Sequence, residues 1–358
     1  MTEEVIANTA AGDHFDHLNV DGYISSFIDA RSLKTAFEIG LIDLLLQRHS
    51  SPTQSLAQAT GVDARGLNFL LGLLKMNNVI EVDYGDVRLH ADFQKVLRFR
   101  DLLETKLDFA GFLLDDFADY FTFLIRDPQR FVGQSRLFEL FDYRRAMTDS
   151  LENYQRTRAW MRLTSTLTRY EALACMGLYD FTGHRRMLDL GGNSGEFALQ
   201  LCRRHRQLSA TVFDLPLVCE IGLEKMMSEP ESARIGFCSG DLRTDRLPFG
   251  HDLVTFKSVL HDWPQEDADH FLESAVQAIE PGGKLVIFER APIDPQQKPP
   301  TFADLPVMLF FRSYRPPEAY MDTLARLGLL EITCRTVGLD TSFFLISAHK
   351  PSCPVIAP

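Results

Sequence analysis

The chain has 358 residues, of which 45% are hydrophobic and 24% charged, a composition typical of a globular protein with a large core. Its formal net charge of −12 argues against nucleic-acid binding, because contacts to phosphates need a basic surface. The six cysteines show no zinc-site spacing, the N-terminus has no apolar signal region, and no apolar run reaches the roughly 18 residues of a membrane span. We therefore expect a cytoplasmic protein with no metal, no nucleic-acid partner and no membrane partner.

The N-terminal part, residues 1–105, is expected to form a small helical domain with one hairpin. Apolar residues recur at helical spacing over 23–49, 51–61 and 62–78, and a short hairpin follows that turns at 84–86. Three helices followed by a two-stranded wing predict an all-α winged-helix-like domain. The third helix offers only Arg65 and Lys75 as basic residues, so we expect this domain to serve packing or homodimer formation instead of DNA binding.

Residues 106–180 are expected to be a mainly helical linker that is rich in phenylalanine. Two interpretations stay open for these aromatic side chains, a core with a dimer interface and an aromatic wall for a flat or greasy substrate. The phenylalanines concerned, counted from residue 100, are Phe109, Phe112, Phe117, Phe121, Phe123, Phe131, Phe138 and Phe141.

From residue 181 to 350 the pattern changes to short apolar runs that alternate with helical stretches. The runs "RRMLDLGG", "LSATVFDLP", "ARIGFCSGD", "HDLVTFKSV" and "GGKLVIFER" predict five strands of a parallel sheet covered by helices on both faces. Two further strands after residue 328 are expected to add an antiparallel edge. The fold class is therefore α/β, a Rossmann-like doubly wound domain, and the tail over 351–358 is expected to be flexible.

Ligands of doubly wound sheets bind at the carboxyl ends of the strands, so the residues that follow each strand identify the ligand. The first strand ends in "DLGGNSGEF", a glycine loop that opens onto a helix but lacks the spacing of a dinucleotide site. Asp189, Asp214 and Asp241 stand at three successive strand ends. Three carboxylates would repel a pyrophosphate, so they favour a polar, adenosine-like and cationic cofactor such as a sulfonium.

The ordered set "DLGGNSG", "VFDLP", "GDL", "FKSVLHDW" and "PGGKLVIFE" resembles the S-adenosylmethionine-dependent O-methyltransferases of the caffeate and hydroxyindole type. The resemblance implies an S-adenosylmethionine cofactor, a homodimer formed through the N-terminal half, and an aromatic natural product as substrate. It places Asp214 at the ribose, and Asp241 and Leu242 beside the adenine. Asn193 stands where the family often has glycine, and asparagine tolerates the left-handed backbone. The residues implied to line the cofactor site are Gly191, Asp214, Leu215, Asp241, Leu242 and Lys257.

The stretch "VLHDWPQED" carries the candidate catalytic residue. We expect Asp262 to cap the helix that follows, with Gln265 at its third position, Pro264 in its first turn and Trp263 packed on the core. This leaves His261 unexplained at the carboxyl end of a strand, facing the cofactor crevice, and we predict that it is a general base. The resemblance implies that Glu289, at the end of the next strand, orients the histidine.

One departure from the family concerns the second acid that usually supports the histidine, because Tyr314 stands near its position. Trp160 and Met161 resemble the helix that faces the acceptor in relatives, although core packing explains them equally. Met308 and Tyr314 are further candidate substrate contacts. Three functions stay open beside O-methyl transfer: methylation of a phenolic ring carbon by the same base, a repurposed chemistry without methyl transfer, and cofactor binding by a regulator or scaffold.

Overall fold

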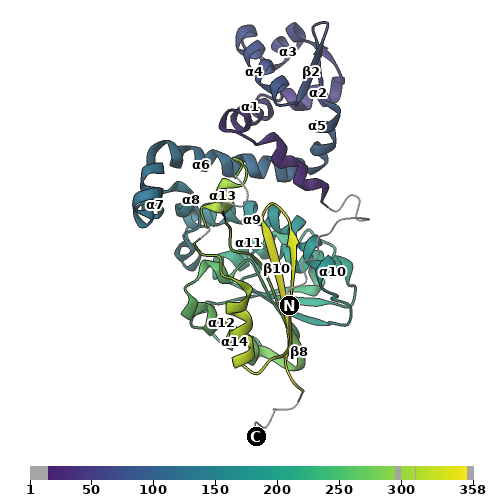
Figure 1. Cartoon of the computed structure of the whole chain (residues 1–358). Coiled ribbons are helices and arrows are strands. Elements are labelled where there is room, and N and C mark those ends of the chain that lie inside the picture. The colour runs from purple at the N-terminus through teal and green to yellow at the C-terminus, as the bar shows by residue number, and fades with distance from the viewer. Residues whose placement is uncertain (1–14, 295–299, 311, 353–358) are drawn as a thin grey trace. The chain divides into compact units, whose positions relative to one another are not determined.

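The computed structural model describes residues 15–294, 300–310 and 312–352 (Figure 1). Residues 1–14 and residues 353–358, which make up most of the predicted flexible tail, lie outside the described residues. The chain divides into two compact units. The N-terminal unit comprises residues 15–139 and 300–309, and the sheet unit comprises residues 140–294, 310 and 312–352. The segment boundaries expected at 105 and 180 stay predictions.

The N-terminal unit has the expected order of helices followed by a hairpin. Tyr84 and Gly85 form the turn with φ angles of 47° and 89°, the left-handed pair that a two-residue hairpin turn requires. Its elements are η1 (Asp16–Tyr23), α1 (Phe27–Glu38), α2 (Leu41–Arg48), β1 (Ser51–Pro52), α3 (Thr53–Thr60), α4 (Ala64–Met76), β2 (Ile80–Asp83), β3 (Asp86–Leu89), α5 (Ala91–Val96), η2 (Leu97–Phe99), α6 (Arg100–Arg126), α7 (Pro128–Gln134), α8 (Arg136–Leu140, ending in the sheet unit) and α13 (Leu305–Met308).

The sheet unit is built on seven strands in the order β6-β5-β4-β7-β8-β10-β9. The pairs among β4 to β8 are parallel and both pairs of β10 are antiparallel, which confirms the doubly wound sheet and its antiparallel edge. The strands are β4 (Arg186–Leu190), β5 (Ser209–Asp214), β6 (Ile235–Ser239), β7 (His251–Lys257), β8 (Ile279–Arg290), β9 (Leu330–Gly338) and β10 (Ser342–His349). The helices are η3 (Tyr143–Met147), α9 (Leu151–Leu178), α10 (Glu196–Arg204), α11 (Pro216–Met226), η4 (Ser232–Arg234), η5 (Leu260–Asp262), α12 (Gln265–Ala278) and α14 (Pro317–Arg326).

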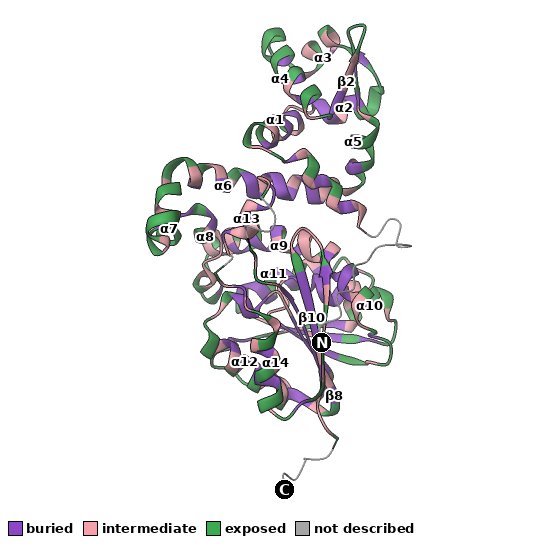
Figure 2. Cartoon of the chain, viewed as in Figure 1, coloured by how far each residue is buried: buried purple, intermediate pink, exposed green. Residues whose placement is uncertain are grey.

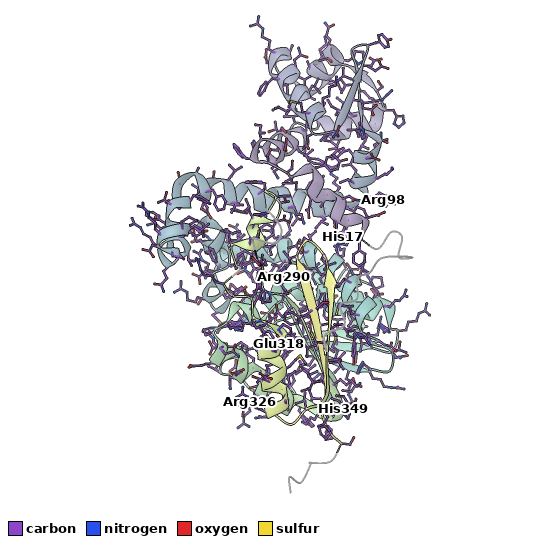
Figure 3. All side chains as sticks on the ribbon, in the orientation of Figure 1. His17, Arg98, Arg290, Glu318, Arg326 and His349 are labelled. Carbon is purple, nitrogen blue, oxygen red and sulfur yellow. The ribbon has the colours of Figure 1, made fainter. Side chains whose placement is uncertain are left out.

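The inner strands β4, β7, β8 and β10 are mostly buried on both faces (Figure 2), whereas the edge strand β9 is largely exposed, and alternate residues of the inner strands face opposite sides of the sheet. On β8, Leu285 and Ile287 pack in the cluster that includes residues of α12 and α14. The same alternation continues to the end of the strand, so that Glu289 bonds to His261 on this face while Arg290 bonds to Glu171 of α9 on the other. Figure 3 labels Arg290 at one end of the sheet and His349 at the other. Two neighbouring residues thereby supply charge to two separate sites.

Among the described residues, no helix combines the length and the apolar character needed to cross a membrane. Within the same residues, no three histidine, cysteine or acidic side chains gather closely enough to hold a metal ion.

Candidate active site

The loop between β4 and α10 is a tight glycine turn at the carboxyl edge of the sheet. Gly191 and Gly195 have φ angles of 64° and 74°, and Asn193, at 55°, adopts the same left-handed backbone, as expected for asparagine. A Cβ at Gly192 would lie 2.5 Å from the Asp189 carboxylate. A Cβ at Gly191 would lie 2.8 Å from both γ-carbons of Val259, so the loop packs directly on the segment that leads to His261.

Two carboxyl groups border this loop. Asp214 accepts hydrogen bonds from the N–H groups of Asn193 at 2.8 Å and Leu215 at 2.7 Å, and burial raises its pKa to about 6. Asp189 is 1% exposed, accepts a hydrogen bond from the Thr255 hydroxyl on Oδ1 at 2.7 Å, and has a pKa that burial raises to about 7. Its Oδ2 is buried and has no hydrogen-bond partner among the described residues. Both carboxyls would ionise more readily beside a cation.

Asp241 and Leu242 follow β6, and their side chains lie in different surroundings. Leu242 is buried in the core on the α12 side of the sheet. Asp241 accepts hydrogen bonds from the Arg243 guanidinium at 2.6 Å and 2.9 Å, and this bond to Arg243 holds the pKa of the carboxyl below its usual range. The guanidinium of Arg243 also lies 5.3 Å from the ring centre of Trp263. Arg243 is not among the residues predicted from the sequence, although a basic residue two positions after Asp241 could have indicated this ion pair.

Lys257 is directed at α9 on the opposite face from His261. Its ammonium donates a hydrogen bond to the Thr168 hydroxyl at 2.9 Å and forms an ion pair with Glu171. Glu171 also pairs with Arg290, and all three charged side chains are more than 90% buried. Burial opposes ionisation of Glu171, but the charges of Arg290 and Lys257 outweigh it and lower its pKa. Sequence reasoning missed Glu171 because nothing near it in the chain reveals the two cations.

His261 lies on the 3₁₀ turn η5 and is held by Glu289, the residue that the family resemblance implies as its partner. The distance from its Nδ1 to Glu289 Oε2 is 2.7 Å. The other oxygen of Glu289 accepts the N–H groups of Val259 at 2.7 Å and Leu260 at 2.9 Å. Glu289 is 1% exposed, so a single buried carboxylate fixes both the backbone of the turn and the imidazole that it carries.

Asp262 does not cap α12, and that prediction is wrong. The residue before the helix is Pro264, which makes no side-chain cap, because the chain first completes the turn η5. The Asp262 carboxylate instead lies beside the histidine, with Oδ1 3.2 Å from His261 Nε2, and its Oδ2 accepts a hydrogen bond from the Tyr143 hydroxyl at 2.8 Å. Burial lowers the pKa of His261, but Asp262 and Glu289 outweigh it, so that the pKa is raised.

Tyr314 lies beside the histidine, with the two ring centres 5.0 Å apart. It is 7% exposed, and burial raises its pKa, so it is a neutral neighbour. The second carboxylate next to His261 is therefore Asp262 from the same turn. The following residue, Arg315, donates hydrogen bonds to the backbone oxygens of Leu260, at 2.8 Å, and Trp263, and so secures both ends of the turn.

The O-methyltransferase domain family matches residues 126–319, which is more than half of the 358 residues. The chain belongs to the O-methyltransferase family. It is 36% identical over 178 residues to a 3-hydroxy-5-methyl-1-naphthoate 3-O-methyltransferase of Streptomyces sahachiroi, and 29% identical over 173 residues to an acetylserotonin O-methyltransferase of Bos taurus. Each alignment covers 48% of this chain and 50% of the relative, so the chain spans about half the length of these relatives.

Solved structures of O-methyltransferases share the fold of this chain. Human N-acetylserotonin methyltransferase, solved in complex with S-adenosylmethionine, is 21% identical with a TM-score of 0.68, covering 96% of this chain and 100% of that one. The mitomycin 7-O-methyltransferase MmcR is also 21% identical, with a TM-score of 0.69, covering 89% of this chain and 94% of that one. At this identity the likeness concerns the fold alone.

The structure of this member of the O-methyltransferase family separates the four predicted substrate contacts. Trp160 and Met161 of α9 are buried in a cluster with apolar side chains of α11. The ring of Trp160 also meets the ring of Tyr143 edge to face at a centre-to-centre distance of 5.5 Å, and Tyr143 in turn donates a hydrogen bond to Asp262. Tyr314 borders His261. Met308 belongs to α13 in the N-terminal unit, and its contact with a substrate stays a prediction.

Proposed function

We propose that this protein transfers a methyl group from S-adenosylmethionine to a hydroxyl of an aromatic natural product, with His261 as the general base. The observation that carries the proposal is the close packing of the glycine loop on the histidine turn. Gly191 lies against Val259, and the N–H of Val259 is bonded to Glu289, the partner of His261. A donor site at the loop and a base at the turn would therefore open onto one crevice.

The residues at the loop fit a cationic adenosine-like cofactor. Asp189 has an oxygen without a partner among the described residues, and Asp214 stands at the end of β5 with a raised pKa, so both would gain from a nearby positive charge. When bound, the cofactor supplies an electrophilic methyl carbon. Gly191 and Leu215 would line the cofactor site, and Leu242 would supply an apolar wall beside the adenine. Asp241 and Lys257 are already paired with Arg243 and Glu171, so we expect them to act within those pairs.

The proton of the acceptor would pass to Nε2 of neutral His261. In that state Nδ1–H donates to Glu289 and the lone pair lies on Nε2. The imidazolium that forms faces two carboxylates, Glu289 and Asp262, which stabilise its charge. A phenol and an ordinary histidine differ by roughly 3.5 pKa units, or about 5 kcal/mol, and the raised pKa of His261 narrows that gap.

An aromatic acceptor is supported by the rings around the histidine turn. Tyr143 stacks on Trp263 at a ring distance of 6.2 Å and meets Trp160 at 5.5 Å, while Tyr314 lies 5.0 Å from His261. Flat faces of this kind favour flat ligands through dispersion and ring quadrupoles. The Streptomyces relative is named for a hydroxylated naphthoate. We propose a hydroxylated bicyclic aromatic acid as the first acceptor class to test.

The test supplies hydroxynaphthoates and related phenols with S-adenosylmethionine and follows S-adenosylhomocysteine by mass spectrometry and the new methyl group by NMR. The proposal expects a methyl ether. A methyl group on a ring carbon would support the C-methylation alternative. If the protein binds the cofactor but forms no S-adenosylhomocysteine with any acceptor of the panel, the proposed reaction is wrong and a cofactor-binding role is favoured.

We propose that the protein is a homodimer formed through its N-terminal unit. Phe69 and Met76 of α4 are 70% and 82% exposed, and large apolar side chains on one helix favour a protein partner. Sedimentation velocity at micromolar concentration tests this, and a monomer would contradict it. The double change Phe69→Asp with Met76→Asp is expected to shift a dimer to monomer.

A further inference from the structure

A series of polar contacts, two hydrogen bonds and one ion-pair contact, runs from η3 to the end of β8 through the candidate base. The Tyr143 hydroxyl donates to Asp262 Oδ2 at 2.8 Å, Asp262 Oδ1 lies 3.2 Å from His261 Nε2, and His261 Nδ1 lies 2.7 Å from Glu289 Oε2. The four residues in this series come from η3, η5 and β8, which are far apart in the sequence. His261 therefore has a carboxylate on each ring nitrogen, and one of the two carboxylates is itself held by a tyrosine.

We propose that Tyr143 is a positioning residue for His261, acting through Asp262 to set the orientation and the proton affinity of the imidazole. The inference rests on the proposed function only in so far as His261 is the base. Tyr143 is fixed in place for this role, because its ring stacks on Trp263 and meets Trp160 edge to face. Its hydroxyl is thereby directed at one oxygen of Asp262, which leaves the other oxygen for Nε2.

The electrostatic effect of the tyrosine follows from its hydrogen bond. A donor to a carboxylate stabilises the anion and reduces the attraction of that anion for a second proton. With Tyr143 in place, Asp262 holds the imidazolium of His261 less tightly than a bare buried carboxylate would. Removal of the hydroxyl therefore raises the proton affinity of the Asp262–His261 pair. Other charged and titratable groups lie around the pair and Tyr143 and remain unchanged in the experiment below. Glu289 and Arg290 of β8 act on the pair, and Asp214 of β5 acts on Tyr143. Tyr314 and Tyr320 interact with Asp262, and Arg315 bonds to the backbone of the turn.

The test uses Tyr143→Phe, which keeps both ring contacts and removes only the hydroxyl. Tyr154→Phe is the matched control, because Tyr154 of α9 also donates to a carboxylate, Glu224, and packs at the rim of the Trp160 cluster. The readout is the pair of ring ¹⁵N resonances of His261 in the full chain without cofactor or acceptor, between pH 5 and 9. The resonances are assigned by their loss in His261→Gln.

In the unaltered protein we expect the imidazolium of His261 to persist above the ordinary histidine pKa of 6.5. Tyr143→Phe is expected to move the titration upward by about one pH unit, a tenfold gain in proton affinity, and Tyr154→Phe to leave it in place. An unmoved titration in Tyr143→Phe overturns the proposal. Equal shifts in both variants also overturn it, because the effect would then not pass through Asp262.

A second variant tests the route of the effect, and it serves if Tyr143→Phe fails to fold. Asp262→Asn removes the negative charge beside Nε2, so the proposal expects the pKa of His261 to fall by about one unit, since Glu289 alone is then left to offset the effect of burial. In the Asp262→Asn background, Tyr143→Phe should have no further effect on the titration. A full Tyr143 effect in that background, or an unchanged titration in Asp262→Asn alone, contradicts the proposed route.

The outcome is separable from that of the proposed function. If the protein transfers no methyl group but the ¹⁵N titration moves as expected, the positioning role stands and the reaction is wrong. If methyl transfer depends on His261 but the acid limb of kcat/KM is the same in the unaltered protein and Tyr143→Phe, the reaction stands and the positioning role is wrong.

Discussion

Replacement of Glu289 by glutamine is expected to nearly abolish methyl transfer while leaving the fold and the cofactor site intact. Oε1 of Glu289 accepts two backbone N–H groups, at 2.7 Å and 2.9 Å, and Oε2 meets His261 Nδ1 at 2.7 Å. In the glutamine variant the carbonyl oxygen has to stay with the two N–H donors, because an NH₂ group there would face them. The NH₂ group then donates to Nδ1, which places the ring hydrogen on Nε2 and removes the lone pair that takes the proton.

The size of this effect follows from the tautomer and the lost charge. Reversal of a histidine tautomer by an acid-to-amide change lowers kcat by about 10⁴ in a serine-protease triad. We expect a loss of roughly 10³ to 10⁴ in kcat for Glu289→Gln. Single-turnover methyl transfer at saturating cofactor measures it, with cofactor affinity by calorimetry and thermal unfolding as controls. A folded variant that binds the cofactor and keeps kcat within tenfold of the unaltered protein would refute the role of Glu289.

Three further predictions concern pH and the glycine loop. Because the pKa of His261 is raised and only the neutral ring accepts a proton, kcat/KM should rise with pH, with its midpoint above about pH 6.5; a midpoint at or below pH 6.5 contradicts this. The same histidine should stabilise the fold below about pH 6.5 and lose that contribution as pH rises through its folded pKa. Burial raises the pKa values of Asp214 and Asp189 to about 6 and about 7, so the affinity for S-adenosylmethionine should increase as pH rises through this range. The affinity for S-adenosylhomocysteine, which lacks the sulfonium charge, should increase less, and calorimetry in two buffers can measure the difference as proton release. Equal pH dependence for both ligands would count against a sulfonium site. Gly192→Ala should destabilise the protein by about 1–3 kcal/mol and weaken cofactor binding, because its Cβ would lie 2.5 Å from the Asp189 carboxylate. The control is Gly111→Ala in α6, where nothing lies near the added Cβ, and thermal unfolding should show it to be neutral or stabilising.

Local periodicity predicts the sheet and places His261 and Glu289 at the ends of two successive strands, while their pairing is implied by the family resemblance. Each strand is a short apolar run, and the residue that follows it must lie at the carboxyl edge. The turn after β7 and the end of β8 are neighbours in a parallel sheet, so two strand ends suffice to bring the histidine and the glutamate together. The glycine loop is predictable for the same reason, since its close contacts lie at the edge of the same sheet.

The partners of Asp262 and Lys257 could not be predicted, because they come from distant segments. The spacing after Asp262 is that of a helix cap, yet its carboxylate accepts from Tyr143, 119 residues earlier in the chain. Lys257 follows a strand as a cofactor contact would, yet Glu171 on α9 holds its ammonium. Local patterns place the backbone of a residue, whereas the direction of a long or charged side chain depends on which opposite charge the tertiary fold brings near it.

The central claim is that His261 takes the proton of the acceptor. Its most direct test compares the single-turnover rate of His261→Ala with that of the unaltered protein, using a hydroxylated aromatic acceptor at saturating S-adenosylmethionine. We predict a fall of about 10² to 10⁴ in the rate with unchanged cofactor affinity. A variant that binds the cofactor and methylates the acceptor at the full rate would contradict the account.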